Sequence, residues 1–295
     1  MNKNLKKEKS IKQNGLLGYV WAILLILVIQ TFLYQPFTIP SGSMVPTLLV
    51  GDFIMVNKFA YGYSRYSMFL QPKFIKGRFK TGEPKQGDVV VFFHDYKLEN
   101  EAKFYDRGMF GGFFQRLWRN IRCAIGCPSE GVSYVKRVIG LPGDHIQMRN
   151  GQLFINNVPT QLTRKGDYPL FDDGMPPIAK LYEETLPNGV KHYILKAFDF
   201  GKASLDNTEE FVVPEKSYFC MGDNRDNSCD SRDIKQVGFI DENKLIGGPT
   251  FLFFSTNAKL WQVHKWLFSI RWKRLFHAYW TKLLHPFRAN LTEVC

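Results

Sequence analysis

The strongest constraint on the fold of this 295-residue chain is one uncharged segment near its N-terminus. Residues 16–34 carry no charged side chain, and Gln30 and Thr31 are their only clearly polar members. A helix of this length would span about 28 Å at about 1.5 Å per residue, which matches the hydrocarbon core of a bilayer. We therefore predict one transmembrane helix over residues 16–34 and expect membrane lipid as a partner.

The charges that flank this segment predict its orientation. Residues 1–15 contain five Lys and one Glu, whereas the next basic residue after the segment is Lys58. The positive-inside rule then makes residues 1–15 a cytoplasmic tail and places the rest of the chain outside. A cleavable signal peptide is the alternative, but its apolar core is usually only about 7–15 residues long. No clear small-x-small site follows directly, so we favour an uncleaved anchor.

The distribution of charge argues against nucleic acid as a partner. The net charge is +12, but residues 16–249 hold 27 basic and 25 acidic residues, so most of the excess lies at the two ends. A nucleic-acid-binding domain would carry a positive stripe on its folded body. Basic ends around an apolar span are more typical of a membrane protein.

The sequence pattern of the body of the chain predicts short strands. Runs of β-branched and aromatic residues are bounded by Gly, Pro or Asp. They cover residues 53–57, 88–93, 133–139, 145–148, 152–155, 210–213, 218–221, 237–240 and 250–254. Asn150 and Gly151 predict a hairpin turn. Long helical periodicity is absent from the body, so we predict a mainly antiparallel β fold.

Two parts of the body form the predicted β core, and one is predicted to be an insertion. The core is assigned to residues 35–156 and 211–256. Residues 157–210 are rich in turn signals and are interpreted as an inserted subdomain or long loops. Residues 62–85 and 97–130 show no clear period, and the role of the latter stays open.

The remaining residues, 257–295, form a basic, aromatic tail. Within it, five apolar residues recur at helical spacing, and basic residues fall between them. The apolar set is Trp272, Leu275, Phe276, Tyr279 and Leu283. This pattern predicts a C-terminal amphipathic helix over residues 272–284. Whether it packs on the body or lies on the outer leaflet stays open.

The five cysteines are too few for a disulfide scaffold. Cys123 and Cys127 have neither a second pair nor a histidine cluster at zinc-ligand spacing, so we predict no metal site. Cys220 and Cys229 are interpreted as small buried apolar residues, with a disulfide between them as the weaker hypothesis. The pairing of Cys123 and Cys127 stays open, and a local disulfide between them is plausible if this part of the chain lies outside the cytoplasm.

Ser43 and Lys136 are the residues with the clearest chemical potential. A serine hydroxyl is a poor nucleophile without a base, and a lysine in water keeps its proton. Burial among apolar neighbours such as Val135 and Val138 would favour the neutral amine. Arg137 follows directly, but alternation along a strand predicts that it points to the opposite face and forms an ion pair elsewhere.

These two residues belong to a set of motifs that resembles bacterial type I signal peptidases, also called leader peptidases. The set comprises Pro-Ser-Gly-Ser-Met-x-Pro-Thr-Leu at 40–48, Gly-Asp at 51–52, Lys-Arg-x-x-Gly-Leu-Pro-Gly-Asp at 136–144 and Gly-Asp-Asn-Arg-Asp-Asn-Ser-x-Asp-Ser-Arg at 222–232. The likeness covers about residues 36–59, 84–94, 132–156 and 211–254. It implies a signal-peptidase-like β fold and a Ser/Lys serine endopeptidase without a cofactor. Its expected substrates are exported preproteins, whose signal peptides are cut after small-x-small motifs.

The resemblance also implies a role for each matching residue. Ser43 would be the nucleophile and Lys136 the general base. Ser41 would donate to the oxyanion, and Ser228 would orient the lysine amine. The supporting ion pair would be Asp230 with Arg232, and the pockets for small side chains would be lined by Phe37, Ile39, Tyr134 and Val135. The location implied is the bacterial inner membrane, with the catalytic domain on the periplasmic side.

Two other functions remain as alternatives. A catalytically inactive, membrane-anchored binding module of the same fold is disfavoured by the intact set Ser41, Ser43, Lys136 and Ser228. A soluble Ser/Lys peptidase related to self-cleaving repressors is disfavoured by the predicted anchor. Asp226 and its neighbours also have a simpler interpretation as turn-forming residues.

Overall fold

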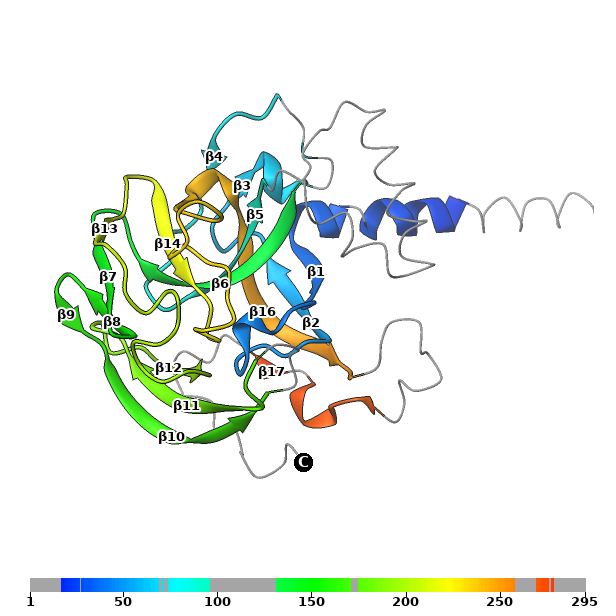
Figure 1. Cartoon of the computed structure of the whole chain (residues 1–295). Helices are drawn as coiled ribbons and strands as arrows, with labels where there is room; N and C mark the ends of the chain where they lie inside the picture. Colours follow the sequence, from blue (N-terminus) through cyan, green and yellow to red (C-terminus); the bar gives the residue numbers. More distant parts are fainter. Residues whose placement is uncertain are drawn as a thin grey trace, which may run out of the picture.

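The computed structural model describes residues 17–26, 28–68, 71, 74–95, 131–170, 175–257, 269–275 and 277–278. All the pairings between its named strands are antiparallel. The prediction of a mainly antiparallel β fold is therefore confirmed. Figure 1 shows the β body with the N-terminal helix extending from one side.

One large sheet runs through the centre of the body (Figure 1). Its order is β1 (Tyr34–Thr38), β2 (Asp52–Asn57), β16 (Leu245–Ser255), β5 (Val89–His94), β6 (Val132–Gly140), β14 (Ser217–Met221) and β15 (Ile240–Asp241), and β17 (His277–Ala278) pairs with β16. Side chains of β2 alternate between buried and half-buried positions, as expected for a strand with one face on the core. The sheet thus joins segments from both ends of the chain.

Three smaller sheets complete the body. The four-stranded sheet contains β13 (Phe211–Val212), β7 (His145–Arg149), β8 (Gln152–Ile155) and β9 (Val158–Pro159), in that order. The three-stranded sheet contains β10 (Gln161–Pro169), β11 (Ile178–Thr185) and β12 (Lys191–Lys196). A two-stranded sheet pairs β3 (Tyr63–Ser64) with β4 (Arg78–Phe79). Short 3-10 turns are η1 (Gly42–Met44), η2 (Arg65–Ser67), η3 (Glu242–Lys244) and η4 (Trp272–Arg274).

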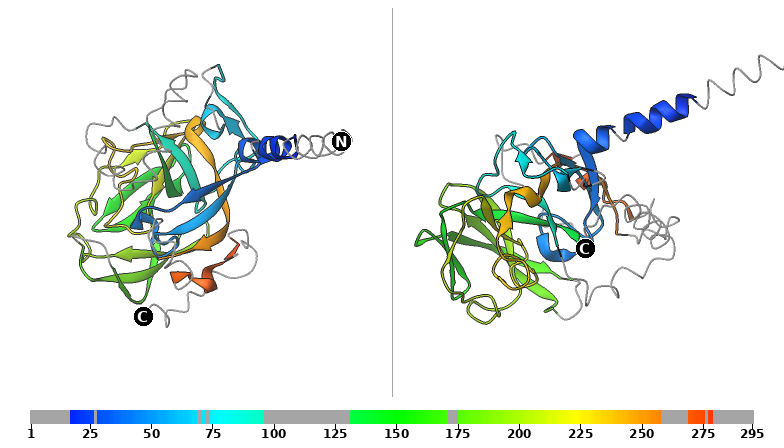
Figure 2. Two further views of the ribbon diagram at one scale, coloured as in Figure 1. Left: turned by 90° about the vertical axis from the view of Figure 1, so that its right-hand side faces the viewer. Right: turned by 90° about the horizontal axis from the view of Figure 1, so that it is seen from above.

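The residues set apart as an insertion, 157–210, carry the whole three-stranded sheet, named here the inserted sheet. It lies at one side of the body, away from the helix (Figures 1 and 2). Asn150 and Asn156 have positive φ, which asparagine tolerates in tight turns. Asn150 with Gly151 makes the predicted turn between β7 and β8.

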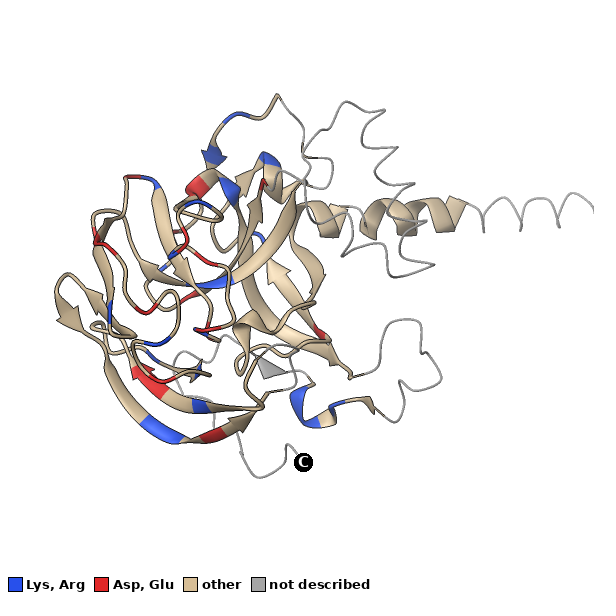
Figure 3. Ribbon diagram, in the orientation of Figure 1, with Lys and Arg blue, Asp and Glu red and all other residues tan. Residues whose placement is uncertain are grey.

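The N-terminal helix includes residues 17–26 and 28–32 and projects from the body (Figures 1 and 2). Figure 3 shows no charged residue on its described part. Lys58 Nζ donates to the carbonyl of Gln30 at 2.6 Å, and the Tyr63 hydroxyl donates to the carbonyl of Phe32. These contacts satisfy carbonyls at the end of the helix.

The predicted span extends too far at its C-terminal end. Tyr34 is already the first residue of β1, where it pairs with Asn57 of β2. Backbone pairing with β2 therefore replaces helical hydrogen bonding just after the last helical residue. In the described part of the chain, no helix is both long and apolar enough to cross a membrane.

The prediction of a continuous amphipathic helix over 272–284 is wrong in the residues that can be compared. Trp272 to Arg274 form only one 3-10 turn, and His277 with Ala278 pairs with β16 instead. Leu275 is a turn residue, and residues 276 and 279–284 lie outside the described residues. Arg271 and Arg274 both bind the buried carboxylate of Asp52, with Nη2–O distances of 3.3 and 2.6 Å. Ion pairing to the body thus overrides the helical pattern.

Asp52 is therefore expected to attach the tail to the β body. Its side chain is fully buried and also accepts a hydrogen bond from Ser255 Oγ at 2.6 Å. Asp52→Asn should lower the free energy of unfolding by about 2–3 kcal/mol, because two arginines lose a charged acceptor. Denaturant unfolding followed by tryptophan fluorescence would measure the loss.

The matched control is Asp167→Asn, since Asp167 pairs with Arg164 on the surface. It should leave the unfolding midpoint unchanged. Equal midpoints for the two variants would contradict the structural role of Asp52.

Candidate active site

Ser43 lies in the turn η1, which three residues separate from the end of β1. Three buried apolar residues hold this turn to the core: Ile39, Met44 and Leu48. The chain on both sides is also fixed by backbone hydrogen bonds, from Ile39 to the Asp52 carbonyl and from Gly51 to the Ile39 carbonyl. The half-buried Ser43 side chain is thus presented on a turn whose neighbours cannot move freely.

Lys136 lies on β6 and reaches this turn. Its Nζ is 2.7 Å from Ser43 Oγ, although the two residues are 93 positions apart. The residue is only 3% exposed, and its partner on β5, Val90, is fully buried. Side-chain alternation places Tyr134 and Val138 on the same face of β6, and both pack in the apolar cluster that contains Val90.

Burial lowers the pKa of the Lys136 amine to about 8, because an apolar surrounding disfavours the charged form. The charged and titratable groups near it have smaller, opposing effects on its pKa. Asp230, Cys229 and Asp223 raise it, whereas Arg232 lowers it. The structure therefore brings together a serine hydroxyl and a lysine amine that loses its proton more readily than an exposed one.

Arg137 points to the other face of β6, as the strand alternation predicts. Its Nε and Nη2 donate to both carboxylate oxygens of Asp223, at 2.8 and 2.6 Å. Thr47, four residues after Ser43, donates to the same carboxylate. Because all three side chains converge, Asp223 ties β6 to the turn that carries Ser43.

A second buried ion pair joins Asp230 and Arg232. Arg232 donates through Nε and Nη2 to the two oxygens of Asp230, at 2.8 and 2.9 Å. Burial alone would raise the pKa of Asp230, but Arg232 and the backbone N–H of Gly222 hold it below its ordinary value. The pair is thus a fixed charge arrangement beside Lys136.

Ser228 is the predicted site residue whose placement departs from expectation. Its Oγ is buried and has no hydrogen-bond partner among the described residues, so the expected bond to the Lys136 amine is not made. It lies against Gly222, where an added Cβ would fall 2.1 Å from Ser228 Oγ and 2.6 Å from the Ser43 carbonyl oxygen. Only glycine at position 222 leaves room for both serines.

Ser41 is exposed, and its side chain makes no capping hydrogen bond to η1.

The residues predicted to line the substrate pockets do not all gather in one place. Phe37, Ile39 and Val135 pack in a single apolar cluster around Met44. Tyr134 lies on the opposite face of β6, where its ring stacks on His94 at 5.4 Å. Its ring centroid is also 5.9 Å from Lys136 Nζ, so it lies near this amine rather than in the cluster around Met44.

The hypothesis of a disulfide between Cys220 and Cys229 is wrong. Cys220 is fully buried, and burial raises the pKa of its thiol. The exposed thiol of Cys229 instead donates to Gln236 Oε1 at 3.1 Å. The other three cysteines lie outside the described residues.

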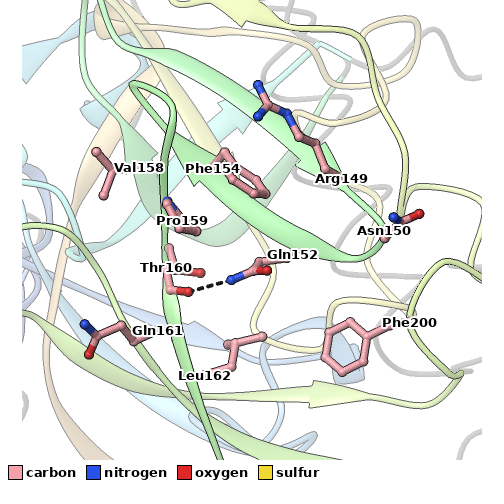
Figure 4. Close-up of a pocket in the computed structure, with 10 residues that line it drawn as sticks. All are labelled: Arg149, Asn150, Gln152, Phe154, Val158, Pro159, Thr160, Gln161, Leu162 and Phe200. Carbon is pink, nitrogen blue, oxygen red and sulfur yellow. Dashed lines mark hydrogen bonds between the residues drawn. The ribbon is translucent and has the colours of Figure 1, made fainter.

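An open depression of about 940 Å³ lies on another part of the surface (Figure 4). Residues of the β7–β10 region line it, among them Arg149 and Phe154, together with Phe200. None of its lining residues belongs to the set predicted for catalysis. It is therefore separate from the site around Ser43.

Three residues that contact the Ser43 turn or the loop after β14 were not identified from the sequence. Asn224 donates from its backbone N–H to the Ser43 carbonyl at 3.1 Å and from its side chain to the Gly42 carbonyl at 3.2 Å. Glu184 and Lys196 are fully buried charges on the inserted sheet, bound to the same loop as Asn224. The one sequence feature that could have indicated buried ion pairs at Glu184 and Lys196 is that both charged residues lie within strand-like runs.

Comparison with known proteins gives consistent results. The family model described as signal peptidase, peptidase S26, matches residues 13–254. Signal peptidase I of Rickettsia typhi (strain ATCC VR-144 / Wilmington) is 35% identical over 290 residues, covering 92% of this chain and 96% of that protein. Signal peptidase I of Rickettsia prowazekii (strain Madrid E) is 34% identical over 291 residues, with the same coverage.

A solved structure of a signal peptidase I from Enterococcus faecalis V583 matches 56% of this chain and 96% of its own, at 21% identity. Its TM-score is 0.25, which is too low to support a structural argument.

The burial of Lys136 leads to a direct prediction about its titration. In the solubilised protein, the amine should titrate near pH 8, well below the ordinary value of about 10.4 for lysine. NMR of protein labelled with ¹³C-lysine would measure the midpoint, and the signal missing from Lys136→Met would assign it. A midpoint above about 10 would show that water reaches the amine.

Proposed function

Because this chain belongs to the signal peptidase family, peptidase S26, we propose that it is a membrane-anchored serine endopeptidase that removes signal peptides from exported preproteins. Family membership supports hydrolysis of peptide bonds. The observation that carries the catalytic assignment is the 2.7 Å contact between Lys136 Nζ and Ser43 Oγ. The lowered pKa of the buried lysine supports the same assignment.

In the proposed reaction, Ser43 Oγ attacks the scissile carbonyl while the neutral amine of Lys136 takes the hydroxyl proton. The resulting ammonium gives a proton to the leaving amine of the mature protein, and an ester to Ser43 remains. Water, activated by the same amine, then hydrolyses the ester and frees the signal peptide. A pKa of about 8 suits both steps, because the amine can release and accept a proton near neutral pH.

The hydroxyl of Ser41 and the backbone N–H of Ser43 are proposed to bind the oxyanion. The freedom of the Ser41 side chain from any capping hydrogen bond supports this role. Ser228 is proposed to orient the Lys136 amine, and its buried, unsatisfied hydroxyl next to Gly222 is available for it. Asp230 and Arg232 are proposed to support this arrangement.

The substrate is proposed to bind as an extended strand. Among the described strands, β1 has an unpaired edge, and β14 pairs only with the second half of β6, leaving residues 132–136 open on that side. Main-chain hydrogen bonds to such edges give affinity, and pockets between alternate side chains give selectivity. We assign the selection of small side chains, as in small-x-small motifs, to Phe37, Ile39 and Val135, with Tyr134 closer to the reacting groups.

The surface around the N-terminal helix supports membrane anchoring. The large apolar side chains of the helix are exposed, from Leu17 at 59% to Phe32 at 47%. Phe59 and Phe79, at 50% and 72% exposure, continue this apolar surface onto the body, and Phe32 and Phe59 both pack edge-on against Tyr63. Such surfaces are stable in lipid rather than in water. We propose a single pass through the inner membrane, with the N-terminus in the cytoplasm and the body on the periplasmic side.

The proposed dyad makes a prediction about two substitutions. Ser43→Ala and Lys136→Met should each lower kcat for preprotein cleavage in detergent by about 10⁴-fold or more, with the fold retained. The acid limb of the wild-type pH–rate profile should lie near pH 8, since Lys136 must be neutral. Cleavage is measured by gel shift of the processed protein, and circular dichroism checks the fold. Substantial cleavage by either variant would rule out the dyad, whereas an inactive wild-type chain that still binds signal peptide would favour a binding module.

The proposed lipid contact of Phe59 and Phe79 can be tested separately. The double variant Phe59→Ser with Phe79→Ser should cleave a preprotein embedded in liposomes several-fold more slowly, because the body is less firmly held at the surface. In detergent its activity should equal that of the wild type. Val158→Ser is the control, since Val158 is also exposed but lies on β9, far from the helix (Figure 1). Equal liposome activities for all three proteins would contradict the proposal.

A further inference from the structure

The inserted sheet is hydrogen-bonded to the loop that holds Ser43. The edge strand β12 pairs with β11 on one side. On its other side, Leu195 donates from its N–H to the Asp223 carbonyl at 2.9 Å and accepts from the Arg225 N–H at 3.0 Å. The residues after Gly222 therefore extend this sheet by a short parallel bridge, Leu195 to Asn224.

Lys196, the last residue of β12, adds a buried ionic contact to the same loop. Its Nζ lies 2.6 Å from Asp226 Oδ1 and 2.5 Å from Asp206 Oδ1, and its side chain is 1% exposed. The second oxygen of Asp226 accepts the backbone N–H groups of Ala197 and Phe198, at 2.9 and 3.0 Å. Through these three contacts, Asp226 fixes the loop to the end of β12.

Glu184 on β11 makes the second ionic contact. Both of its oxygens bind the guanidinium of Arg225, and Thr160 donates to Oε1 at 2.9 Å. The carbonyl of Arg225 accepts in turn from Arg232 at 2.5 Å, and Arg232 pairs with Asp230 beside Lys136. Two sets of charge-assisted hydrogen bonds, joined through the side chain and the backbone carbonyl of Arg225, thus connect the inserted sheet with the ion pair beside Lys136.

Consecutive residues of this loop contact two different parts of the molecule, the Ser43 turn with β6 and the inserted sheet. The Asp223 side chain and the Asn224 backbone hold Arg137, Thr47 and the Ser43 carbonyl. The side chains of Arg225 and Asp226 hold Glu184 and Lys196. The two sets of contacts are thus made by four consecutive residues, 223–226.

We propose that the inserted sheet is a positioning element for the Ser43–Lys136 pair, and that Glu184 and Lys196 are its positioning residues. They contact neither reacting group. They hold the loop that binds the Ser43 turn through Asn224 and carries the Asp230–Arg232 pair near Lys136. This inference rests on the proposed dyad. It assigns a part in catalysis to a subdomain that lies outside the motifs of the site.

The test compares Lys196→Met with Lys165→Met in the full-length, detergent-solubilised enzyme. Lys196→Met removes the cation from Asp226. Lys165→Met removes a lysine from the same sheet, where it pairs with Glu183 at 3.3 Å without contacting the loop. For each variant, kcat and KM for a preprotein are measured as functions of pH, with activity corrected for the folded fraction.

Lys196→Met should lower kcat about tenfold or more, because small displacements of reacting groups are costly to the rate. KM should change little, since Phe37, Ile39 and Val135 lie outside this network. A loosened loop also admits water to Lys136, so the acid limb should move to higher pH, toward the ordinary lysine pKa. Lys165→Met should match the wild type in all three respects.

Glu184→Gln is the second variant, to be used if Lys196→Met does not fold. It keeps the shape of the side chain and removes its charge. It should shift the acid limb in the same direction by a smaller amount. A merely structural role would reduce the folded fraction without moving the limb, so wild-type kcat and pH profiles in the folded variants would overturn the inference. Ser43→Ala is assayed in parallel. If Ser43→Ala is inactive while the Lys196 and Glu184 variants behave as wild type, only the positioning role is contradicted. If Ser43→Ala is active, the proposed dyad is contradicted.

Discussion

The candidate site depends on keeping water away from one amine. A lysine that is free in solution holds its proton far above neutral pH, so Lys136 can act on Ser43 only where its ammonium form is poorly solvated. Val90, Tyr134 and Val138 provide the apolar surrounding on one face of β6. The neighbouring charges act in opposite directions on its pKa, and burial has the largest effect. Packing of the β core therefore sets the chemistry of the site.

Buried ion pairs of the loop after β14 hold the elements of this water-excluding site together. Buried charges are costly unless they are paired and hydrogen-bonded. Here the three aspartates take their cations from three different elements: Asp223 from β6, Asp226 from β12 and Asp230 from the loop itself. Unpairing any one of them would leave a buried charge unsatisfied. The cost of that loss fixes the relative position of β6, the inserted sheet and the Ser43 turn.

Much of the β core was predictable, because local patterns follow strand geometry directly. Residues 53–57, 88–93 and 133–139 all fall within or next to observed strands, and alternation along β6 correctly placed Arg137 opposite Lys136. Long-range pairing was not predictable. Nothing in the local sequence shows that Glu184 meets Arg225 or that two arginines of the tail bind Asp52. For the same reason the helical pattern at 272–284 was misleading, since the free energy of a distant ion pair outweighs local periodicity. The motif at 222–232 contains both Gly222 and Ser228, but it does not show that the Ser228 hydroxyl packs against Gly222 without a hydrogen-bond partner among the described residues.

The passage from helix to strand has a consequence for substrate choice. Only Leu33 separates the last described helical residue from β1, and Lys58 fastens the end of the helix to the body. Such a junction has no linker that could lengthen or swing. For a helix anchored in lipid, Ser43 would then stand at a set height above the bilayer, limited by nine residues of chain to about 30 Å. The enzyme would then select a signal peptide by the length of its apolar segment as well as by its small side chains.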